Sequence, residues 1–184
     1  MPREAEDLNR RALSVRFLLM DVDGVLTDGR IIPLPGEEGE EIKAFDSKDG
    51  LGMMLARRAG IGLGLLSGRS AGVVARRARD LGIVEVLQGR LPKTPAYLEL
   101  RDRLGLTDVE VCYIGDDIVD VPLLRRVGLG VAPADAHPEA RRAAAWVTER
   151  PGGRGAVREV IDRILRAQDR WDAVVRPLLE DSED

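Results

Sequence analysis

The stretch Phe17-Leu18-Leu19-Met20-Asp21-Val22-Asp23-Gly24 decides the fold of this 184-residue chain. Four apolar residues run directly into an acidic one, and this pattern predicts a buried strand that ends at Asp21. Comparable apolar runs recur along the chain, at 61–66, 84–87, 109–114 and 129–131. Segments of helical spacing separate them, and this alternation is typical of a parallel sheet with helices on both faces. We therefore predict an α/β fold with three layers and a Rossmann-like parallel sheet.

The remaining segments fill in this plan. Helices are expected at 49–59, 71–81, 92–104, 119–126 and 138–145, and one long amphipathic helix, ended or kinked near Pro177, is expected at 157–179. A stretch rich in Pro, Gly and Glu lies between short apolar segments and predicts a projecting β-hairpin over about residues 30–45. We expect a lead-in at 1–15 and one domain at 16–184, whose C-terminal helix and tail cover about 156–184.

Composition excludes several classes of function. The net charge of -4 and the 3% of aromatic residues argue against a nucleic-acid binder, which needs a basic surface and stacking platforms. One Cys and one His exclude an internal disulfide and a His/Cys zinc cluster, so a metal must be held by oxygen, as magnesium is. No apolar run approaches the ~20 residues that span a bilayer. We expect no membrane partner and a cytoplasmic protein.

The first acidic motif is Asp21-Val22-Asp23-Gly24. Two carboxylates after a buried strand repel each other unless a divalent cation lies between them. With the cation bound, one carboxylate can act as a nucleophile and the other can transfer a proton. A simple turn after the strand is the ordinary alternative for such a short motif.

Further polar residues follow other predicted strands. Gly115-Asp116-Asp117-Ile118-Val119-Asp120 supplies three carboxylates, Ser67 ends a third strand, and Lys93 begins a helix. Helix capping explains a lone Ser or Asp equally well, and Lys93 alone reads as a surface residue. Ligands of parallel sheets bind at the carboxyl ends of the strands, so the set together favours phosphoryl transfer.

Lysine use is a further clue. Lys43, Lys48 and Lys93 are the only lysines among the 28 basic residues. A chain that prefers arginine this strongly can retain lysine where a compact point charge is needed. Codon bias with three chance exceptions is the competing interpretation.

These motifs identify a family resemblance that runs from about residue 17 to about residue 168. The chain resembles the haloacid dehalogenase superfamily, and within it the capless 3-deoxy-D-manno-octulosonate 8-phosphate phosphatases of lipopolysaccharide synthesis. The stretches that carry the resemblance are 21–29, 39–45, 48–50, 115–117, 134–138 and 152–159. The resemblance implies a magnesium-dependent phosphomonoester hydrolase that forms an aspartyl-phosphate, has no cap domain and assembles as a homotetramer around its hairpins.

The same resemblance implies roles for individual residues. The implied catalytic residues are Asp21, Asp23, Ser67, Lys93 and Asp120, with Asp120 orienting Lys93. The implied Mg²⁺ ligands are Asp21, the carbonyl of Asp23, Asp116 and, through water, Asp117. The implied contacts to a sugar-acid phosphate are Asp23, Asp46, Ser47, Lys48, Asp49, Gly50, Arg69, Arg77, Lys93 and Arg154.

Alternatives remain at this stage. Pro92 precedes the motif lysine where the family usually has Asn or Asp, and the hairpin turn is acidic, which weakens the substrate assignment. A nine-carbon sugar-acid 9-phosphate, or another small phosphomonoester, is the closest enzymatic alternative; Arg69 and Arg154 favour the eight-carbon acid. Another alternative is a phosphatase-like domain without activity that only holds a tetramer together. A phospho-accepting receiver domain is the non-enzymatic alternative, although its acidic residues are placed differently along the strands.

Overall fold

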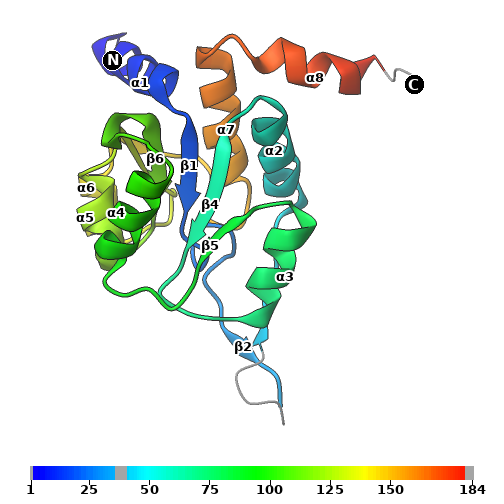
Figure 1. The fold of residues 1–184 in the computed structure, drawn as a ribbon, viewed down its shortest axis with the longest axis vertical. Coiled ribbons are helices and arrows are strands. Elements are labelled where there is room, and N and C mark those ends of the chain that lie inside the picture. The colour runs from blue at the N-terminus through cyan, green and yellow to red at the C-terminus, as the bar shows by residue number, and fades with distance from the viewer. Residues whose placement is uncertain (1, 36–40, 181–184) are drawn as a thin grey trace.

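A parallel sheet forms the centre of the computed structural model, which describes residues 2–35 and 41–180 (Figure 1). Its strand order is β5-β4-β1-β6-β7-β8, and every neighbouring pair is parallel. The strands are β1 (Phe17–Met20), β4 (Gly62–Leu66), β5 (Glu85–Leu87), β6 (Val111–Ile114), β7 (Leu129–Ala132) and β8 (Trp146–Val147). The predicted α/β fold is confirmed.

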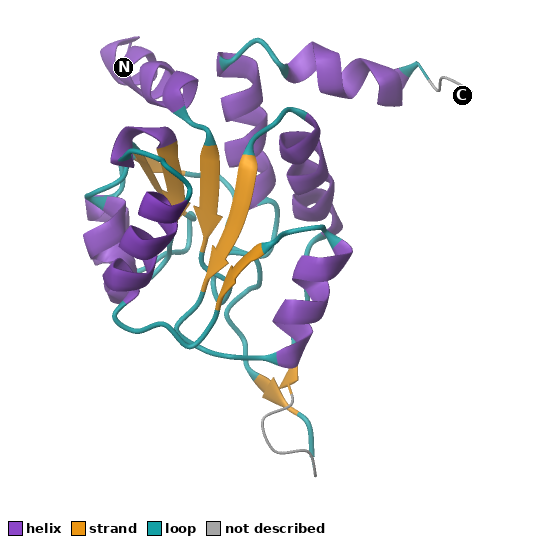
Figure 2. Ribbon diagram, viewed as in Figure 1, coloured by secondary structure: helices purple, strands orange, loops and turns teal. Residues whose placement is uncertain are grey.

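Helices cover both faces of this sheet, as Figure 2 shows. One face carries α2 (Ser47–Arg58), α3 (Gly72–Asp80) and α7 (Ala156–Ala167), with α1 (Pro2–Ser14) and α8 (Trp171–Leu179) packed against α7. The opposite face carries α4 (Lys93–Arg103), α5 (Val121–Leu124) and α6 (Pro138–Ala143). Two short 3₁₀ helices complete the set, η1 (Asp108–Glu110) and η2 (Ile118–Asp120). No helix in the described part of the chain is long and apolar enough to cross a membrane.

Strand β1 is apolar at every position because both of its faces are buried. Leu18 and Met20 point into the core beneath α2 and α7, whereas Phe17 and Leu19 point into the core beneath α4. Successive side chains of a strand face opposite sides of the sheet, so a strand covered on both faces must be apolar at every position. The acidic residue that follows, Asp21, therefore marks the carboxyl edge of the sheet.

The prediction of one helix over 157–179 is wrong, because the chain breaks between α7 and α8. Asp169 adopts a left-handed conformation with φ of 53°. The Gln168 amide donates to the carbonyl oxygens of Ala12 at 2.9 Å and Val15 at 2.8 Å, which fixes the end of α7 against the end of α1. The turn redirects α8 so that Val174 returns to the core. This tertiary packing outweighs the continuous helical periodicity.

The predicted hairpin is present beside α3 (Figure 1), with β2 (Ile32–Pro33) antiparallel to β3 (Glu41–Ile42). Its turn at 36–40 and the C-terminal tail at 181–184 lie outside the described residues. In the two strands of the hairpin the apolar side chains are exposed and the charged ones are buried, the opposite of what is usual for a strand that packs on a core. Ile32 and Ile42 are each 49% exposed, whereas Glu41 and Lys43 are each 8% exposed. The hairpin thus turns charged side chains inward and apolar ones outward.

Candidate active site

Three neighbouring strands bring the predicted polar residues to one edge of the sheet. Asp21 follows β1, Ser67 follows β4 and Asp116 follows β6 by one residue, and β1 lies between the other two strands. The Asp21 backbone N–H donates to the carbonyl of Ile114 at 2.9 Å, which joins the ends of β1 and β6. The fold therefore collects residues from positions 21, 67 and 116 without a special loop.

Asp21 lies in a chain of buried charges. One of its oxygens accepts from the Val22 backbone N–H at 2.7 Å, and the other lies 2.7 Å from Lys93 Nζ. Lys93, at the start of α4, also lies 2.6 Å from an oxygen of Asp120. The exposed fractions of Asp21, Lys93 and Asp120 are 7%, 2% and 0%. The ammonium group thus links the two acidic clusters that the sequence analysis singled out.

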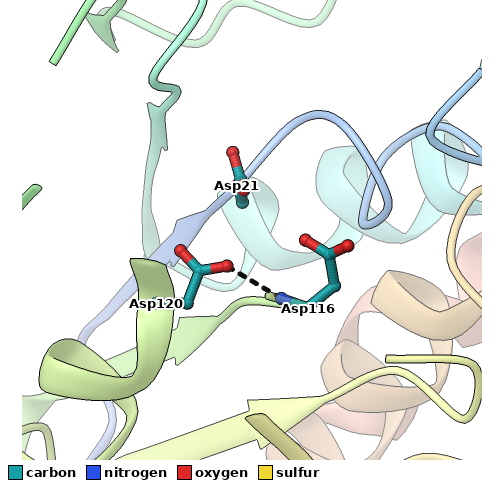
Figure 3. Close-up of side chains that lie close together, drawn as sticks. All are labelled: Asp21, Asp116 and Asp120. Atoms are coloured by element: carbon teal, nitrogen blue, oxygen red, sulfur yellow. Dashed lines mark hydrogen bonds between the residues drawn. The ribbon is translucent and has the colours of Figure 1, made fainter. Parts of the chain in front are cut away.

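Asp120 is the anchor of this arrangement, as its four hydrogen bonds show. Its second oxygen accepts from the backbone N–H groups of Asp116 at 2.9 Å and Asp117 at 3.0 Å; Figure 3 shows the first of these bonds. Its first oxygen accepts from Lys93 and from the Tyr113 hydroxyl, at 2.6 Å each. A buried carboxylate needs such donors to remain charged. Asp120 therefore holds Lys93 and the 116–117 loop together.

Tyr113 is a site residue that sequence reasoning missed. Its hydroxyl donates to Asp120 and accepts from Lys93 Nζ at 3.2 Å, in a position with no exposed surface. The sequence offers no signal for it, because Tyr113 fits a buried strand pattern equally well as a core residue. Only the packing of α4 over β6 shows that its polar end points into the charge network.

Asp116 supplies the third carboxylate of the cluster; Figure 3 shows the three converging from the end of β1, the loop after β6 and the short helix that follows it. Carboxylate oxygens of Asp21, Asp116 and Asp120 all lie within 4.8 Å of one another. A Cβ atom at Gly24 would lie 2.0 Å from an oxygen of Asp116, so only glycine lets the first loop approach this close. Burial and the nearby anions of Asp21 and Asp120 raise the pKa of Asp116 to about 8.

These observations fit a divalent cation. The Asp116 carboxylate has no hydrogen bond or ion pair to any residue in the described ranges, in contrast to Asp120. Burial also raises the pKa of Asp21 to about 6, although Lys93 opposes the shift. Mg²⁺ binds where carboxylates lie close together and are costly to ionise without it, and it prefers oxygen ligands. The Asp21 and Asp116 carboxylates are the oxygens that would hold it.

Lys93 remains charged in this setting. Burial by itself lowers the pKa of its ammonium group, but Asp21 and Asp120 outweigh this effect and the net shift is upward. A lysine with a raised pKa is protonated throughout the physiological range. Lys93 therefore presents a permanent positive charge beside Asp21.

Asp23 is surrounded differently from Asp21. It is half-buried, and one of its oxygens accepts from the ammonium group of Lys43, which the hairpin brings in. Lys43 and its second partner, Glu41, were not among the predicted site residues. Two signals in the sequence pointed to Lys43: the scarcity of lysine and its place in the 39–45 stretch that carries the family resemblance.

Ser67 and Asp117 both receive backbone hydrogen bonds. The Ser67 hydroxyl oxygen accepts from the Arg69 backbone N–H at 3.1 Å, and an oxygen of Asp117 accepts from the Ile118 N–H at 2.7 Å. Ser67 is buried beside Asp21, whereas Asp117 is exposed at the rim. Both positions match the turn and capping chemistry that the sequence allowed, at the edge of the sheet where ligands bind.

The predicted sugar-acid contacts are spread more widely than the catalytic cluster. Arg154 and Asp46 line a pocket of about 250 Å³ together with Phe45 and Asp28. Lys48 lines a separate pocket of about 350 Å³. Ser47, Gly50 and Arg77 line a third one of about 490 Å³ between α2 and α3. Within residues 2–35 and 41–180, the predicted catalytic residues lie together, whereas these predicted contacts line three separate pockets.

Close approaches of glycine position the loop that carries Arg154 and one side of Arg77. A Cβ at Gly152 would lie 1.8 Å from the Gly24 carbonyl, so the 152–155 loop rests directly on the first motif loop. A Cβ at Gly50 would lie 2.6 Å from an Arg77 nitrogen. The Arg77 guanidinium lies 5.6 Å from the ring centroid of Phe45, and its Nε has no hydrogen-bond partner among the described residues. The Gly152 contact thus positions the loop that carries Arg154, whereas Arg77 packs against Phe45 between α2 and α3.

Asp49, another predicted sugar-acid contact, lies in the interior and does not line any of these three pockets. It is 1% exposed, and its carboxylate accepts from the backbone N–H groups of Arg158 at 2.7 Å and Gly155 at 3.3 Å. Burial raises its pKa to about 6, although the bond from Arg158 opposes the shift. Asp49 therefore caps α7 and holds the loop that carries Arg154.

Comparisons with known proteins agree with this geometry. Residues 73–161 match the model of a family of haloacid dehalogenase-like hydrolases. The chain is 46% identical to the 3-deoxy-D-manno-octulosonate 8-phosphate phosphatase of Yersinia pestis, over 91% of this chain and 89% of that protein. It is 44% identical to the Escherichia coli K12 enzyme of the same name, over 90% and 87% of the two chains.

A solved structure extends the comparison to three dimensions. The Moraxella catarrhalis 3-deoxy-D-manno-octulosonate 8-phosphate phosphatase, in complex with magnesium, phosphate and the sugar acid, matches with a TM-score of 0.90 and 38% identity. The match covers 94% of this chain and 98% of that one. The fold and the length therefore agree almost completely.

Proposed function

Because the chain belongs to the haloacid dehalogenase-like hydrolases, and within them to the 3-deoxy-D-manno-octulosonate 8-phosphate phosphatases, we propose that it hydrolyses this sugar-acid phosphate with magnesium as cofactor. The products are the free eight-carbon acid and inorganic phosphate. The observation that carries the proposal is the buried Asp21–Lys93–Asp120 chain beside the Asp116 carboxylate, which has no partner in the part of the chain that the structure describes. The likeness to the magnesium-, phosphate- and sugar-acid-bound enzyme supports the substrate.

In the first half of the reaction, the Asp21 carboxylate attacks phosphorus and the bond from phosphorus to the sugar oxygen breaks. Asp23 gives a proton to that oxygen as it leaves, and an aspartyl-phosphate remains on Asp21. Lys93 and the Ser67 hydroxyl bind the phosphoryl oxygens, and Lys93 is kept in place by Asp120. Asp21, Asp116 and the carbonyl of Asp23, with Asp117 through water, would hold magnesium, which would supply charge neutralisation for the phosphoryl group.

In the second half, water attacks the phosphorus of the aspartyl-phosphate. Asp23 takes a proton from this water, the bond from phosphorus to Asp21 breaks, and both carboxyl groups regain their starting states. A sugar acid adds a carboxylate to the dianionic phosphate, so its site requires further cations. Arg69, Arg77, Arg154 and Lys48 are the candidates, and arginine suits a carboxylate because it bonds with two parallel N–H groups.

A kinetic screen tests the substrate. We expect kcat/KM for 3-deoxy-D-manno-octulosonate 8-phosphate to exceed that for neutral sugar phosphates such as glucose 6-phosphate by at least about 10²-fold, because neutral sugars leave the arginines unpaired. The nine-carbon sugar-acid 9-phosphate is expected to fall between them. A preference for the nine-carbon acid or for a neutral sugar contradicts the assignment.

We also propose that the protein is a homotetramer in which hairpins of neighbouring chains meet. The outward apolar side chains of the hairpin support this proposal, since Ile31, Ile32, Leu34 and Ile42 are all exposed on a small projecting element. Assembly at this face also offers a way to bring the scattered arginine and lysine residues around one substrate. We also propose a cytoplasmic location. The free, buried thiol of Cys112 agrees with it, because the cytoplasm keeps thiols reduced.

Light scattering with size-exclusion chromatography is expected to give a mass near four chains. The Ile42→Asp variant should shift the mass to a smaller assembly, because a carboxylate at this 49% exposed position is harmless in the single chain but opposes apolar association. Val84→Asp is the matched control, since Val84 is 86% exposed and lies outside the hairpin. A monomeric wild-type protein contradicts the proposal.

A further inference from the structure

Lys43 is a buried charge that the proposed chemistry does not use. Of the three lysines in the sequence, Lys43 and Lys93 are 8% and 2% exposed. Lys93 contacts Asp21, the carboxylate that attacks phosphorus. Lys43 contacts Asp23, the carboxylate that exchanges the proton. Each carboxylate of the first motif therefore has a buried lysine of its own, and each lysine arrives from a different part of the chain.

Lys43 belongs to a closed network of four charged side chains. Its ammonium group bonds to Asp23 Oδ1 and lies 2.8 Å from an oxygen of Glu41. The other Glu41 oxygen lies 2.8 Å from a terminal nitrogen of Arg69. Arg69 Nε lies 3.8 Å from Asp23 Oδ2, which is beyond hydrogen-bond range. The network joins the hairpin, the loop after β1 and the loop after β4.

The two oxygens of Asp23 therefore differ. Oδ1 is occupied by the Lys43 ammonium, whereas Oδ2 accepts no hydrogen bond from any residue in the described ranges. The Asp23 side chain is 19% exposed, so part of it remains accessible at the sheet edge. A proton that passes between Asp23 and a substrate then moves by way of Oδ2.

Fold stability alone does not account for Lys43. Its side chain is 1% exposed, and burial by itself lowers the pKa of its ammonium group; Asp23 and Glu41 outweigh this effect and shift the pKa upward. Replacing a buried ion pair by apolar side chains is often neutral or stabilising. A buried lysine on a short hairpin is thus better explained by what its charge does to Asp23.

We propose that Lys43 is a positioning residue that holds Asp23 Oδ1 and so directs Oδ2 toward the leaving oxygen and the incoming water. This inference rests on the proposed function, because it requires Asp23 to exchange the proton. Lys43 keeps all its own protons in both halves of the reaction. Glu41 and Arg69 keep the ammonium and the carboxylate aligned, so the hairpin is part of the proton-transfer machinery.

The dependence on the leaving group tests the proposal. A sugar or other alkyl leaving group needs the proton from Asp23, whereas p-nitrophenolate leaves without one. Lys43→Met is expected to slow single-turnover phosphorylation of Asp21 by the sugar-acid phosphate about 10²-fold. With p-nitrophenyl phosphate, the stopped-flow release of the first equivalent should stay within about fivefold of wild type, and later turnovers should slow because water attack still needs Asp23. Lys43→Arg should recover part of the lost rate.

Two controls separate positioning from a general disturbance. In an Asp23→Asn background, Lys43→Met should have no further effect on either substrate, because residues that act as a unit are not additive. Arg101→Met removes a cation from an ion-pair network with Asp102 and Asp108, away from the site, and should leave both substrates unchanged. Thermal unfolding shows whether each variant is folded. If Lys43→Met is not folded, the two substrates are compared with Lys43→Arg in its place.

Several results would overturn the proposal. Equal slowing of the first turnover on both substrates, or a Lys43→Met effect that persists in full on top of Asp23→Asn, shows that Lys43 does not act through Asp23. Failure of the proposed function is recognised separately, because wild-type protein would then not turn over the sugar-acid phosphate, whatever the Lys43 variants do.

Discussion

Replacing Asp21 by asparagine is expected to lower phosphate release by at least about 10⁴-fold, because an amide cannot attack phosphorus and no other carboxylate lies where Asp21 does. The fold should be retained. Asparagine has the same shape and can still accept the 2.7 Å bond from the Val22 N–H, and Lys93 still has Asp120 as its partner. The measurement combines steady-state phosphate release with circular dichroism and thermal unfolding.

A second measurement isolates the role of Asp21. Wild-type protein quenched with acid during turnover should hold radiolabelled phosphate that hydroxylamine releases, as an acyl phosphate does, and Asp21→Asn should hold none. Asp102→Asn, the same change at a 67% exposed side chain, serves as the control. Substantial turnover by a folded Asp21→Asn protein removes Asp21 as the nucleophile.

Removal of magnesium is expected to have the next largest effect. Chelation should lower turnover about 10³-fold, because a bound divalent cation contributes several kcal/mol of charge stabilisation to phosphoryl transfer. Added Mg²⁺ should restore the activity. Asp116→Asn should bind magnesium more weakly, since it removes the one carboxylate of the cluster that has no protein partner in the described ranges. Activity that is indifferent to chelator contradicts the metal site.

The pH dependence of magnesium binding follows from Asp116. Its pKa of about 8 is raised above the ordinary value of 3.8, so the metal-free protein holds a proton there below pH 8 and loses it above. Magnesium must displace that proton, so its apparent affinity should fall about tenfold per unit as the pH drops from 8 toward 6. Above pH 8 it should level off. Calorimetry in buffers of different ionisation enthalpy reports the released proton, and a flat affinity across this range contradicts the linkage.

Much of the fold was predictable because it rests on local pattern. The continuous apolar run at 17–20 predicted a strand covered on both faces, and β1 has that environment. The prediction for 157–179 failed for the opposite reason, since its periodicity continues through a break. The amide of Gln168 bonds to carbonyls of residues more than 150 positions earlier, and no local signal contains that contact.

The candidate site divides in the same way. Asp21, Ser67 and Asp116 were predictable because each directly follows a strand or lies one residue beyond it, and parallel strands place their carboxyl ends at one edge. Tyr113 was not, because a tyrosine in a buried strand is indistinguishable from a core residue until α4 is packed over it. Lys43 stood out as a rare residue type within a stretch that carries the family resemblance, but its contact with Asp23, twenty positions away, was not predictable.

By itself, the sequence determined the parallel sheet, the sheet edge where the acidic motifs meet and the need for an oxygen-bound cation. These follow from periodicity, strand ends and residue chemistry, which are properties of short segments. Only the tertiary structure decided that Lys43 holds Asp23, that Asp120 also accepts from Tyr113 and from the backbone of the 116–117 loop, and that the hairpin turns Glu41 and Lys43 inward. The reason is physical: the strength of a buried charge pair depends on distance and on exclusion of water, and both are set by elements that lie far apart in the chain.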